Sequence, residues 1–287
     1  MIEVTGLKKS FKKKEVLHGV NLSIGSGICG LLGPNGSGKT TLLRCMTDIY
    51  PNYTGSVRYD GEELAHSASL SRKIGYLPQK FDMFHELRLE EMMRYFAELK
   101  KIPRGEQTAQ IERVLKMVNL YENRKDKVGS MSGGMIRRAG IAQAVLGNPI
   151  AVIVDEPTAG LDPEERLRFK SVVARIGTKC TVLLSTHIIE DVEALCENII
   201  VLYQGQVRFS GTPEEISALA DGHVFIADGS PVEEEGVAVI KQFEHEGRLF
   251  SRLIAAENHG DWRPAEARVE DGYMFIIKGF YHETVLD

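Results

Sequence analysis

Residues 33–40 read GPNGSGKT and match the pattern G-x-x-x-x-G-K-S/T, in which backbone N–H groups wrap the phosphates of a nucleotide. Gly33 and Gly38 allow the turns and the close approach that a Cβ would block. Lys39 supplies a cation for the outer phosphate oxygens, and Thr40 offers a hard oxygen to Mg²⁺. A glycine-rich turn matches this pattern by accident in about one per cent of chains of this length. The octapeptide therefore predicts a nucleotide-phosphate site.

The residues on either side of this loop predict its setting. Residues 28–32 form a short apolar run typical of a buried strand, and residues 41–50 have a pattern that can form a helix. A strand, a loop and a helix in this order are the context in which such a loop binds phosphate.

The composition is that of a soluble globular protein, since 43% of the 287 residues are hydrophobic and 26% are charged. The length allows one large domain, or one domain with an appendage. A net charge of −5 is evidence against nucleic acid as a partner. Four scattered cysteines favour reduced thiols in the cytosol. Because neither a signal peptide nor a run of about 18 apolar residues is present, we expect that the chain itself does not span a membrane.

An aromatic residue near the N-terminus lies among lysines. Residues 1–25 alternate apolar and polar side chains, as antiparallel strands do. Within them, Phe11 is flanked by lysines at positions 8, 9, 12, 13 and 14. A flat ring beside cations can stack on a purine while the lysines attract phosphate. The alternative is that Phe11 packs in the core.

A polar side chain and a helical region follow the phosphate loop. Pro78 ends a predicted strand and leaves Gln79 on a loop at the exit of that strand. Residues 81–120 have a helical pattern and predict a separate helical lobe. The beginning of this block offers four apolar side chains, Phe81, Met83, Phe84 and Leu87, either as a contact surface or as packing for the lobe.

A second glycine-containing motif lies further along the chain. Ser132, Gly133 and Gly134 open a predicted helix, where free N–H groups and the positive end of the helix dipole favour an anion. The alternative is a serine N-cap followed by flexible glycines.

Two carboxylates and a histidine are predicted to meet at one edge of a parallel sheet. Asp155 and Glu156 follow a buried apolar run at 151–154, and His187 follows another at 182–185. Ligands bind at the carboxyl ends of parallel strands. We therefore expect Asp155 to hold Mg²⁺ and Glu156 to orient a water for attack. For His187 a structural role is the alternative.

These motifs, in this order, resemble the ATPase subunits of ATP-binding cassette (ABC) transporters over residues 1–220. The resemblance implies that Phe11 stacks on adenine, that Gln79 senses the γ-phosphate and contributes to the metal site, and that His187 is the switch histidine. The resemblance also assigns residues to the family's motifs. Walker A, with the residue after it, is Gly33, Pro34, Asn35, Gly36, Ser37, Gly38, Lys39, Thr40 and Thr41. The signature contains Ser132, Gly133 and Gly134, Walker B ends at Asp155 and Glu156, and the dimer-contact loop after it contains Asp162.

Three residues differ from the common family pattern. Phe11 stands where the family usually has Tyr, which keeps the stacking face and loses the hydroxyl. Met131 and Met135 replace the Leu and Gln of the L-S-G-G-Q signature, and a Met after the paired glycines is similar to the ATPases of bacterial exporters.

The resemblance implies an α/β fold: a P-loop nucleotide-binding core with an antiparallel β lobe and a helical lobe at about 80–148. Residues 221–287 are expected to form a small C-terminal appendage. It further implies that ATP and Mg²⁺ bind, that the chain pairs with itself or with a related ATPase subunit, and that ATP-driven closure powers transport, in the direction of export, by separate transmembrane permease subunits. We then expect the chain to be cytoplasmic and peripheral on the inner face of the cell membrane.

A different class of function is the alternative. Some cassette ATPases act on nucleic acid or ribosomes, with long coiled-coil insertions or with two cassettes in one chain. The sequence has neither: fewer than about a hundred residues separate Lys39 from Ser132, and they lack heptads. The transport role is therefore favoured, with no nucleic acid as a partner.

Overall fold

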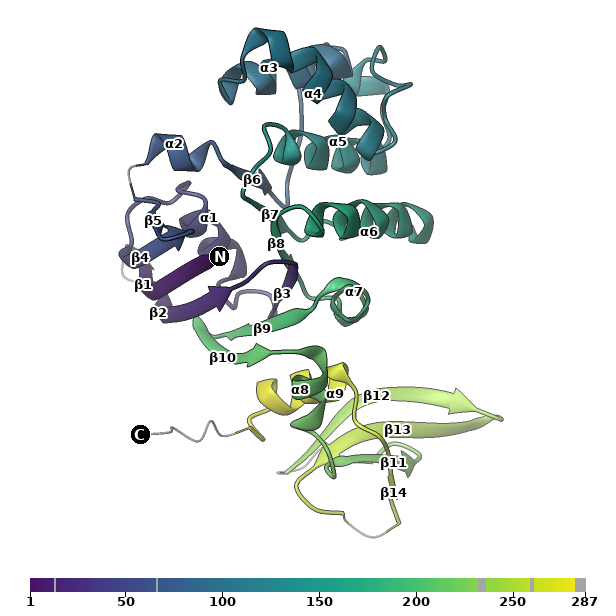
Figure 1. Ribbon diagram of the computed structural model, residues 1–287. Coiled ribbons are helices and arrows are strands. Elements are labelled where there is room, and N and C mark those ends of the chain that lie inside the picture. The colour runs from purple at the N-terminus through teal and green to yellow at the C-terminus, as the bar shows by residue number, and fades with distance from the viewer. Residues whose placement is uncertain (13, 66, 232–235, 259–260, 282–287) are drawn as a thin grey trace.

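The computed structural model describes residues 1–12, 14–65, 67–231, 236–258 and 261–281. Within these ranges the chain forms three β-sheets, with helices around and between them (Figure 1). The predicted α/β fold is confirmed.

The central sheet has the strand order β10-β9-β3-β8-β7-β6. Its members are β3 (Ile28–Leu32), β6 (Ile74–Leu77), β7 (Ala151–Asp155), β8 (Thr181–Thr186), β9 (Asn198–Tyr203) and β10 (Gln206–Gly211). All neighbours are parallel except β10, which runs antiparallel to β9. Strands β3, β7 and β8 are buried along their whole length, because helices or a second sheet cover both faces.

A second, antiparallel sheet has the order β2-β1-β4-β5. It consists of β1 (Ile2–Phe11), β2 (Lys14–Ile24), β4 (Thr54–Tyr59) and β5 (Glu62–Glu63). Helix α1 (Lys39–Met46) lies between this sheet and the central one, and Leu42 and Leu43 are fully buried there. A short helix, α2 (Ala68–Ser71), follows β5. The apolar faces of both sheets thus fix the position of α1, whose first turn directly follows the phosphate loop.

Helices cover the opposite face of the central sheet. They are α5 (Gly133–Val145), α6 (Pro163–Gly177) and α7 (Ile189–Leu195). Helices α3 (Leu89–Leu99) and α4 (Arg104–Met117) pack against α5 on its far side from the sheet (Figure 1), and a 3₁₀ turn η1 (Val128–Ser130) precedes α5. The side chains of Leu32, Val152, Val154, Val182 and Leu184 from the sheet share one core with them.

The first helix of the helical lobe begins later than the sequence predicts. Residues 81–88 are irregular, and the first helix starts only at Leu89. The reason is a local cap: the N–H of Arg88 donates a 2.8 Å hydrogen bond to the Glu91 carboxylate, which is the glutamate half of a capping box.

The C-terminal residues form a third sheet, with the order β12-β13-β11-β14. After α8 (Pro213–Ala218) come β11 (Val224–Asp228), β12 (Val237–His245), β13 (Arg248–Ala255), β14 (Arg263–Pro264) and α9 (Val269–Ile277). Helix α9 returns to the core and packs against α8 so closely that a Cβ on Gly272 would lie 1.8 Å from the Ile216 carbonyl oxygen. A buried ion pair between Arg252 of β13 and Asp271 of α9 joins this sheet to the helix.

No helix in the described part of the chain has both the length and the apolar character needed to cross a bilayer.

Candidate nucleotide-binding site

The phosphate loop connects the end of β3 to the start of α1. A Cβ on Gly33 would lie 2.3 Å from the Leu202 carbonyl oxygen, so only glycine fits there. Gly38 has φ +108°, a left-handed conformation that glycine adopts without a steric penalty, and it is the N-cap of α1. The first turn of a helix leaves backbone N–H groups without intrahelical acceptors. The loop and α1 together therefore present donors to an anion.

Lys39 is held in place by the loop that precedes it. Its ammonium donates hydrogen bonds to the carbonyl oxygens of Gly33 at 2.7 Å and Pro34 at 3.3 Å. The same nitrogen lies 3.4 Å from Glu156 Oε1, and both side chains are only 6% exposed. A buried ammonium is thus fixed where phosphate oxygens are expected.

The two carboxylates at the end of β7 have different surroundings. Asp155 is fully buried, and its Oδ1 accepts a 2.6 Å hydrogen bond from the Ser185 hydroxyl. Glu156 has φ +48°, a left-handed conformation that is uncommon outside glycine and asparagine, and its N–H donates to the Ser185 carbonyl at 3.0 Å. This turn ends the strand and sends the Glu156 side chain in a different direction from that of Asp155.

His187 completes a chain of contacts. Its Nδ1 lies 2.7 Å from Glu156 Oε2, so an ionised Glu156 accepts the hydrogen bond and the proton resides on Nδ1. The His187 side chain is 48% exposed, whereas that of Glu156 is 6% exposed. Lys39, Glu156 and His187 therefore form a continuous path from the phosphate loop to the surface.

A cavity of about 280 Å³ lies in front of these residues. Its walls come from the antiparallel sheet, the phosphate loop, the exit of β6 and the end of β7. They are Val16, Asn35, Gly36, Gly38, Lys39, Thr40, Thr41, Gln79 and Glu156. The structure thus brings together most of the predicted phosphate and catalytic residues.

The donor set at this cavity fits Mg²⁺. Asp155 does not itself line the cavity, but it directly precedes Glu156, which does. Its Oδ2 is buried and has no hydrogen-bond partner among the described residues, and such an orphaned carboxylate oxygen suits a hard cation. Thr40 and Gln79, which carry a hydroxyl and an amide oxygen, line the cavity. Among the residues that the structure describes, no group of three or more His, Cys, Asp or Glu side chains is arranged to hold a metal ion by itself.

Phe11 is not among the residues that line the cavity. It is 39% exposed at the end of β1, packs edge-on against Tyr50 with ring centroids 5.3 Å apart, and has the Lys9 ammonium 5.2 Å from its ring centroid. Lys13 lies outside the described residues. The ring therefore keeps a free face beside a cation.

The signature residues and Asp162 also lie apart from the cavity. Ser132 is the N-cap of α5, and its hydroxyl accepts a 3.2 Å hydrogen bond from the Met135 N–H. Asp162 caps α6 by accepting from the Glu165 N–H at 2.8 Å. Neither residue, nor Gly133 or Gly134, lines the cavity of the same chain.

The sequence does not reveal a buried network behind the site. Asp191 on α7 is 1% exposed and accepts hydrogen bonds from the Thr158 hydroxyl at 2.6 Å and from Arg166 Nε at 2.9 Å. Lys170 lies 2.8 Å from the same carboxylate. The sequence could have indicated Ser185 as a site residue, since it is a polar residue near the end of a buried strand. Nothing in the sequence indicated that Asp191 is buried, because an acidic residue in a helix usually faces solvent.

A glycine-rich loop with a buried lysine, opposite paired carboxylates at the carboxyl ends of parallel strands, defines a P-loop nucleoside triphosphatase. A family model described as "ABC transporter" matches residues 17–159. The chain is 31% identical to the linearmycin resistance ATP-binding protein LnrL of Bacillus subtilis (strain 168), over 85% of this chain and 80% of that protein. It is 32% identical to the Nod factor export ATP-binding protein I of Paraburkholderia xenovorans (strain LB400), over 94% of this chain and 89% of that protein.

Solved structures give the same result. A dimeric, post-hydrolysis structure of the ATP-binding cassette MJ0796 bound to ADP and Pi aligns with a TM-score of 0.66 at 26% identity, covering 74% of this chain and 98% of that one. The structure of cbiO1 from Clostridium perfringens, part of the ABC transporter complex cbiONQ, aligns with a TM-score of 0.69 at 26% identity, covering 76% and 90%. The chain belongs to the ABC transporter family as an ATP-binding subunit with ATPase activity, which confirms the predicted family.

Proposed function

We propose that this chain drives export through separate membrane subunits, by closing as a pair around ATP and reopening after hydrolysis. The observation that carries the proposal is the contact chain from Lys39 through Glu156 to His187, with separations of 3.4 and 2.7 Å. The export direction is supported by relatives named for Nod factor export and linearmycin resistance.

In this proposal Glu156 is the base that accepts a proton from the attacking water. His187 orients Glu156 through their hydrogen bond, and Lys39 holds the outer phosphate oxygens. Asp155, Thr40 and Gln79 are the residues that would hold Mg²⁺. When bound, Mg²⁺ supplies positive charge to the phosphate oxygens.

Two copies are needed to complete the site in this proposal. The signature residues lie at the N-terminus of α5, a helix of 13 residues: Ser132, Gly133 and Gly134. A helix N-terminus favours an anion, but this one does not line the nucleotide cavity of its own chain. We infer that this end of α5, with the loop at Asp162, closes over the phosphate loop of a second ATPase subunit. The solved structure of MJ0796, which is dimeric, supports the pairing of two ATPase subunits.

The proposed contact with the membrane subunits lies at a groove that Gln79 helps to line. A groove of about 450 Å³ is lined by Gln79, Lys80, Phe81, Asp82, Gly133, Ile136 and Arg137, so it joins the γ-phosphate sensor to the signature helix. Beside it, Phe84 is 56% exposed and packs against Tyr95. Met83 is 7% exposed and belongs to the core of the helical lobe, so we assign the anchor to Phe84 and not to Met83. Docking here would hold the chain at the inner face of the cell membrane.

We also propose the division of the chain into an ATPase region at 1–220, with its helical lobe at about 80–148, and a C-terminal appendage at 221–287. The support is the change from the parallel sheet to a separate antiparallel sheet after α8.

The test uses Glu156→Gln in the full chain. Because the amide cannot accept the proton, the variant is expected to bind ATP without turnover, and ATP with Mg²⁺ should convert it to a dimer in sedimentation while ADP should not. The variant that also carries Lys39→Ala is the control and should remain monomeric. A single monomer peak under all nucleotides would contradict pairing of the chain with itself.

A further inference from the structure

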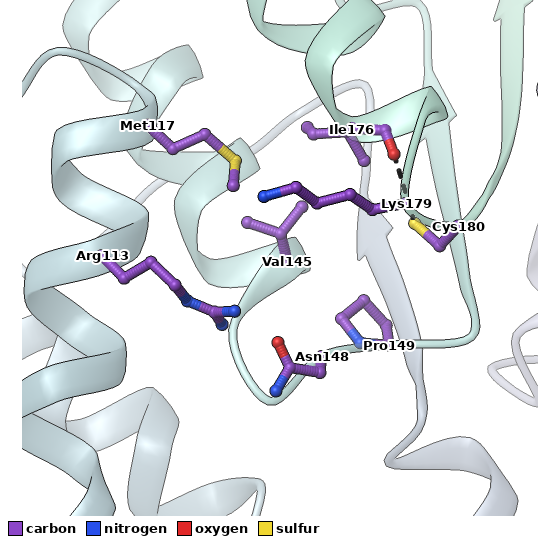
Figure 2. Close-up of a pocket in the computed structure, with 8 residues that line it drawn as sticks. All are labelled: Arg113, Met117, Val145, Asn148, Pro149, Ile176, Lys179 and Cys180. Atoms are coloured by element: carbon purple, nitrogen blue, oxygen red, sulfur yellow. Dashed lines mark hydrogen bonds between the residues drawn. The ribbon is translucent and has the colours of Figure 1, made fainter.

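A pocket of about 160 Å³ lies near the start of strands β7 and β8, and Figure 2 shows the residues that line it. It is bounded by α4, by the end of α5 and by the end of α6. Pro149 lies two residues before β7 and Cys180 lies one residue before β8, whereas the nucleotide site follows those strands. The pocket is therefore separate from the ATPase site.

Two cationic side chains reach into this pocket from opposite sides. Arg113 comes from α4 and Lys179 from the turn after α6, and both point toward Val145 (Figure 2). Within the part of the chain that the structure describes, neither side chain makes an ion pair or a hydrogen bond. Both side chains are exposed, so their charged N–H donors are open to an anion that enters the pocket.

No acidic residue is among the described residues that line the pocket. Burial raises the pKa of the Cys180 thiol above its ordinary value, so the thiol is neutral at pH 7, and its sulfur lies 3.9 Å from the Ile176 carbonyl oxygen. An anion from solution is therefore the group that would balance the two cations.

The floor of the pocket is apolar. Val145 and Ile176 are 6% and 3% exposed, and Met117 lies beside them (Figure 2). An apolar cavity of about 150 Å³ is large enough for benzene. The ligand that fits combines a charged head with a compact hydrocarbon body.

We propose that this pocket binds a small organic carboxylate, with its carboxylate held by Arg113 and Lys179 and its apolar body resting on Met117, Val145 and Ile176. The planar guanidinium matches a carboxylate with two parallel hydrogen bonds. Because Arg113 belongs to the helical lobe and Lys179 precedes β8, a bound carboxylate would connect the two.

The probe is benzoate, added to the full chain with saturating ADP so that the nucleotide cavity is filled. Binding is followed by NMR of ¹³C-methyl methionine, with the Met117 signal identified by Met117→Leu. A saturable shift of that signal by benzoate is expected, with at least about tenfold weaker binding of benzyl alcohol and of inorganic phosphate, each of which supplies half of the ligand. Equal affinity for either half, or no saturable shift with benzoate, would overturn the proposal.

Substitutions test the two cations. Arg113→Gln and Lys179→Gln are each expected to weaken benzoate binding about tenfold, since each removes a charge-assisted hydrogen bond. Both side chains are exposed, so the fold should be kept, and matching thermal melts would verify it. Lys116→Gln, which removes an exposed cation from the same helix outside the pocket, is the control and should bind as the parent does. Unchanged binding in both pocket variants would refute the assignment.

Discussion

The Thr158 hydroxyl donates a 2.6 Å hydrogen bond to the buried carboxylate of Asp191. Thr158 lies in the loop that follows Glu156, and Asp191 lies in the helix that follows His187. Arg166 and Lys170 of α6 bind the same carboxylate. One side chain thus connects the backbone segments that carry the proposed base and the histidine that orients it.

We predict that Asp191→Asn lowers kcat for ATP hydrolysis while KM changes little. Asp191 does not line the nucleotide cavity, but the segments of Glu156 and His187 depend on it for their alignment. The substitution leaves Arg166 and Lys170 without their counter-charge, and we expect a loss of about 1–3 kcal/mol in stability. Steady-state kinetics and denaturant melts check both effects, with Glu190→Gln as an exposed control. A variant that is less stable but keeps the parent kcat would give Asp191 a structural role only.

The same network predicts a pH dependence. Burial disfavours the charged form of Asp191, but hydrogen bonds from Lys170, Thr158 and Arg166 outweigh it, so its pKa lies below the ordinary 3.8. A lowered pKa contributes stability that is complete above the unfolded value and is lost as the pH falls through the folded value. The stability difference between the parent and Asp191→Asn should therefore be constant near neutral pH and shrink below about pH 4. Urea midpoints over this range measure it, and a difference that grows in acid would contradict the prediction.

Lys39→Ala is expected to weaken ATP binding and to abolish hydrolysis. The substitution removes the ammonium that Gly33 and Pro34 hold over the phosphate loop, together with the counter-charge of Glu156. Nucleotide titration and phosphate release provide the measurements. Lys73→Ala, an exposed lysine outside the cavity, serves as the control. Equal ATPase rates for the Lys39 variant and the parent would remove the phosphate loop from the mechanism.

Phe11→Ala is expected to weaken ATP binding by about 1–3 kcal/mol, by analogy with bases stacked on aromatic rings. Phe11→Tyr keeps a flat ring and should bind ATP as the parent does, whereas Phe11→Leu keeps apolar volume alone and should resemble the alanine variant. If Phe11→Ala leaves the dissociation constant unchanged, the ring serves only to pack against Tyr50.

Phe84→Ser tests the contact with the membrane subunits. Because Phe84 is 56% exposed, we expect normal ATPase activity of the isolated chain and a loss of recovery with membranes that contain the partner subunits. Leu167→Ser, at an exposed residue on α6, is the control and should keep both properties. Met83→Ser should instead destabilise the helical lobe by about 2–5 kcal/mol, since Met83 is buried. Full membrane recovery of the Phe84 variant would refute the proposed anchor.

The sequence was most informative where function and structure depend on neighbouring residues. The apolar runs of β3, β7 and β8 predicted buried parallel strands, and the ends of those strands predicted that Glu156 and His187 meet. The first helix of the lobe was predicted to start too early, because the Arg88–Glu91 cap competes with the apolar pattern that extends back to Phe81. The Asp191 network could not be predicted, since it joins residues 33 apart through side chains alone.

The fit of Gly272 against the Ile216 carbonyl also bears on how the chain tolerates truncation. Val269 and Ile276 of α9 share a core with Ile216. In a chain truncated after Ala220, the apolar surface around Ile216 that α9 covers would be exposed to water. Such a fragment is expected to aggregate during expression, although its catalytic motifs are intact. Helix α9 therefore keeps the ATPase core soluble by covering this apolar surface.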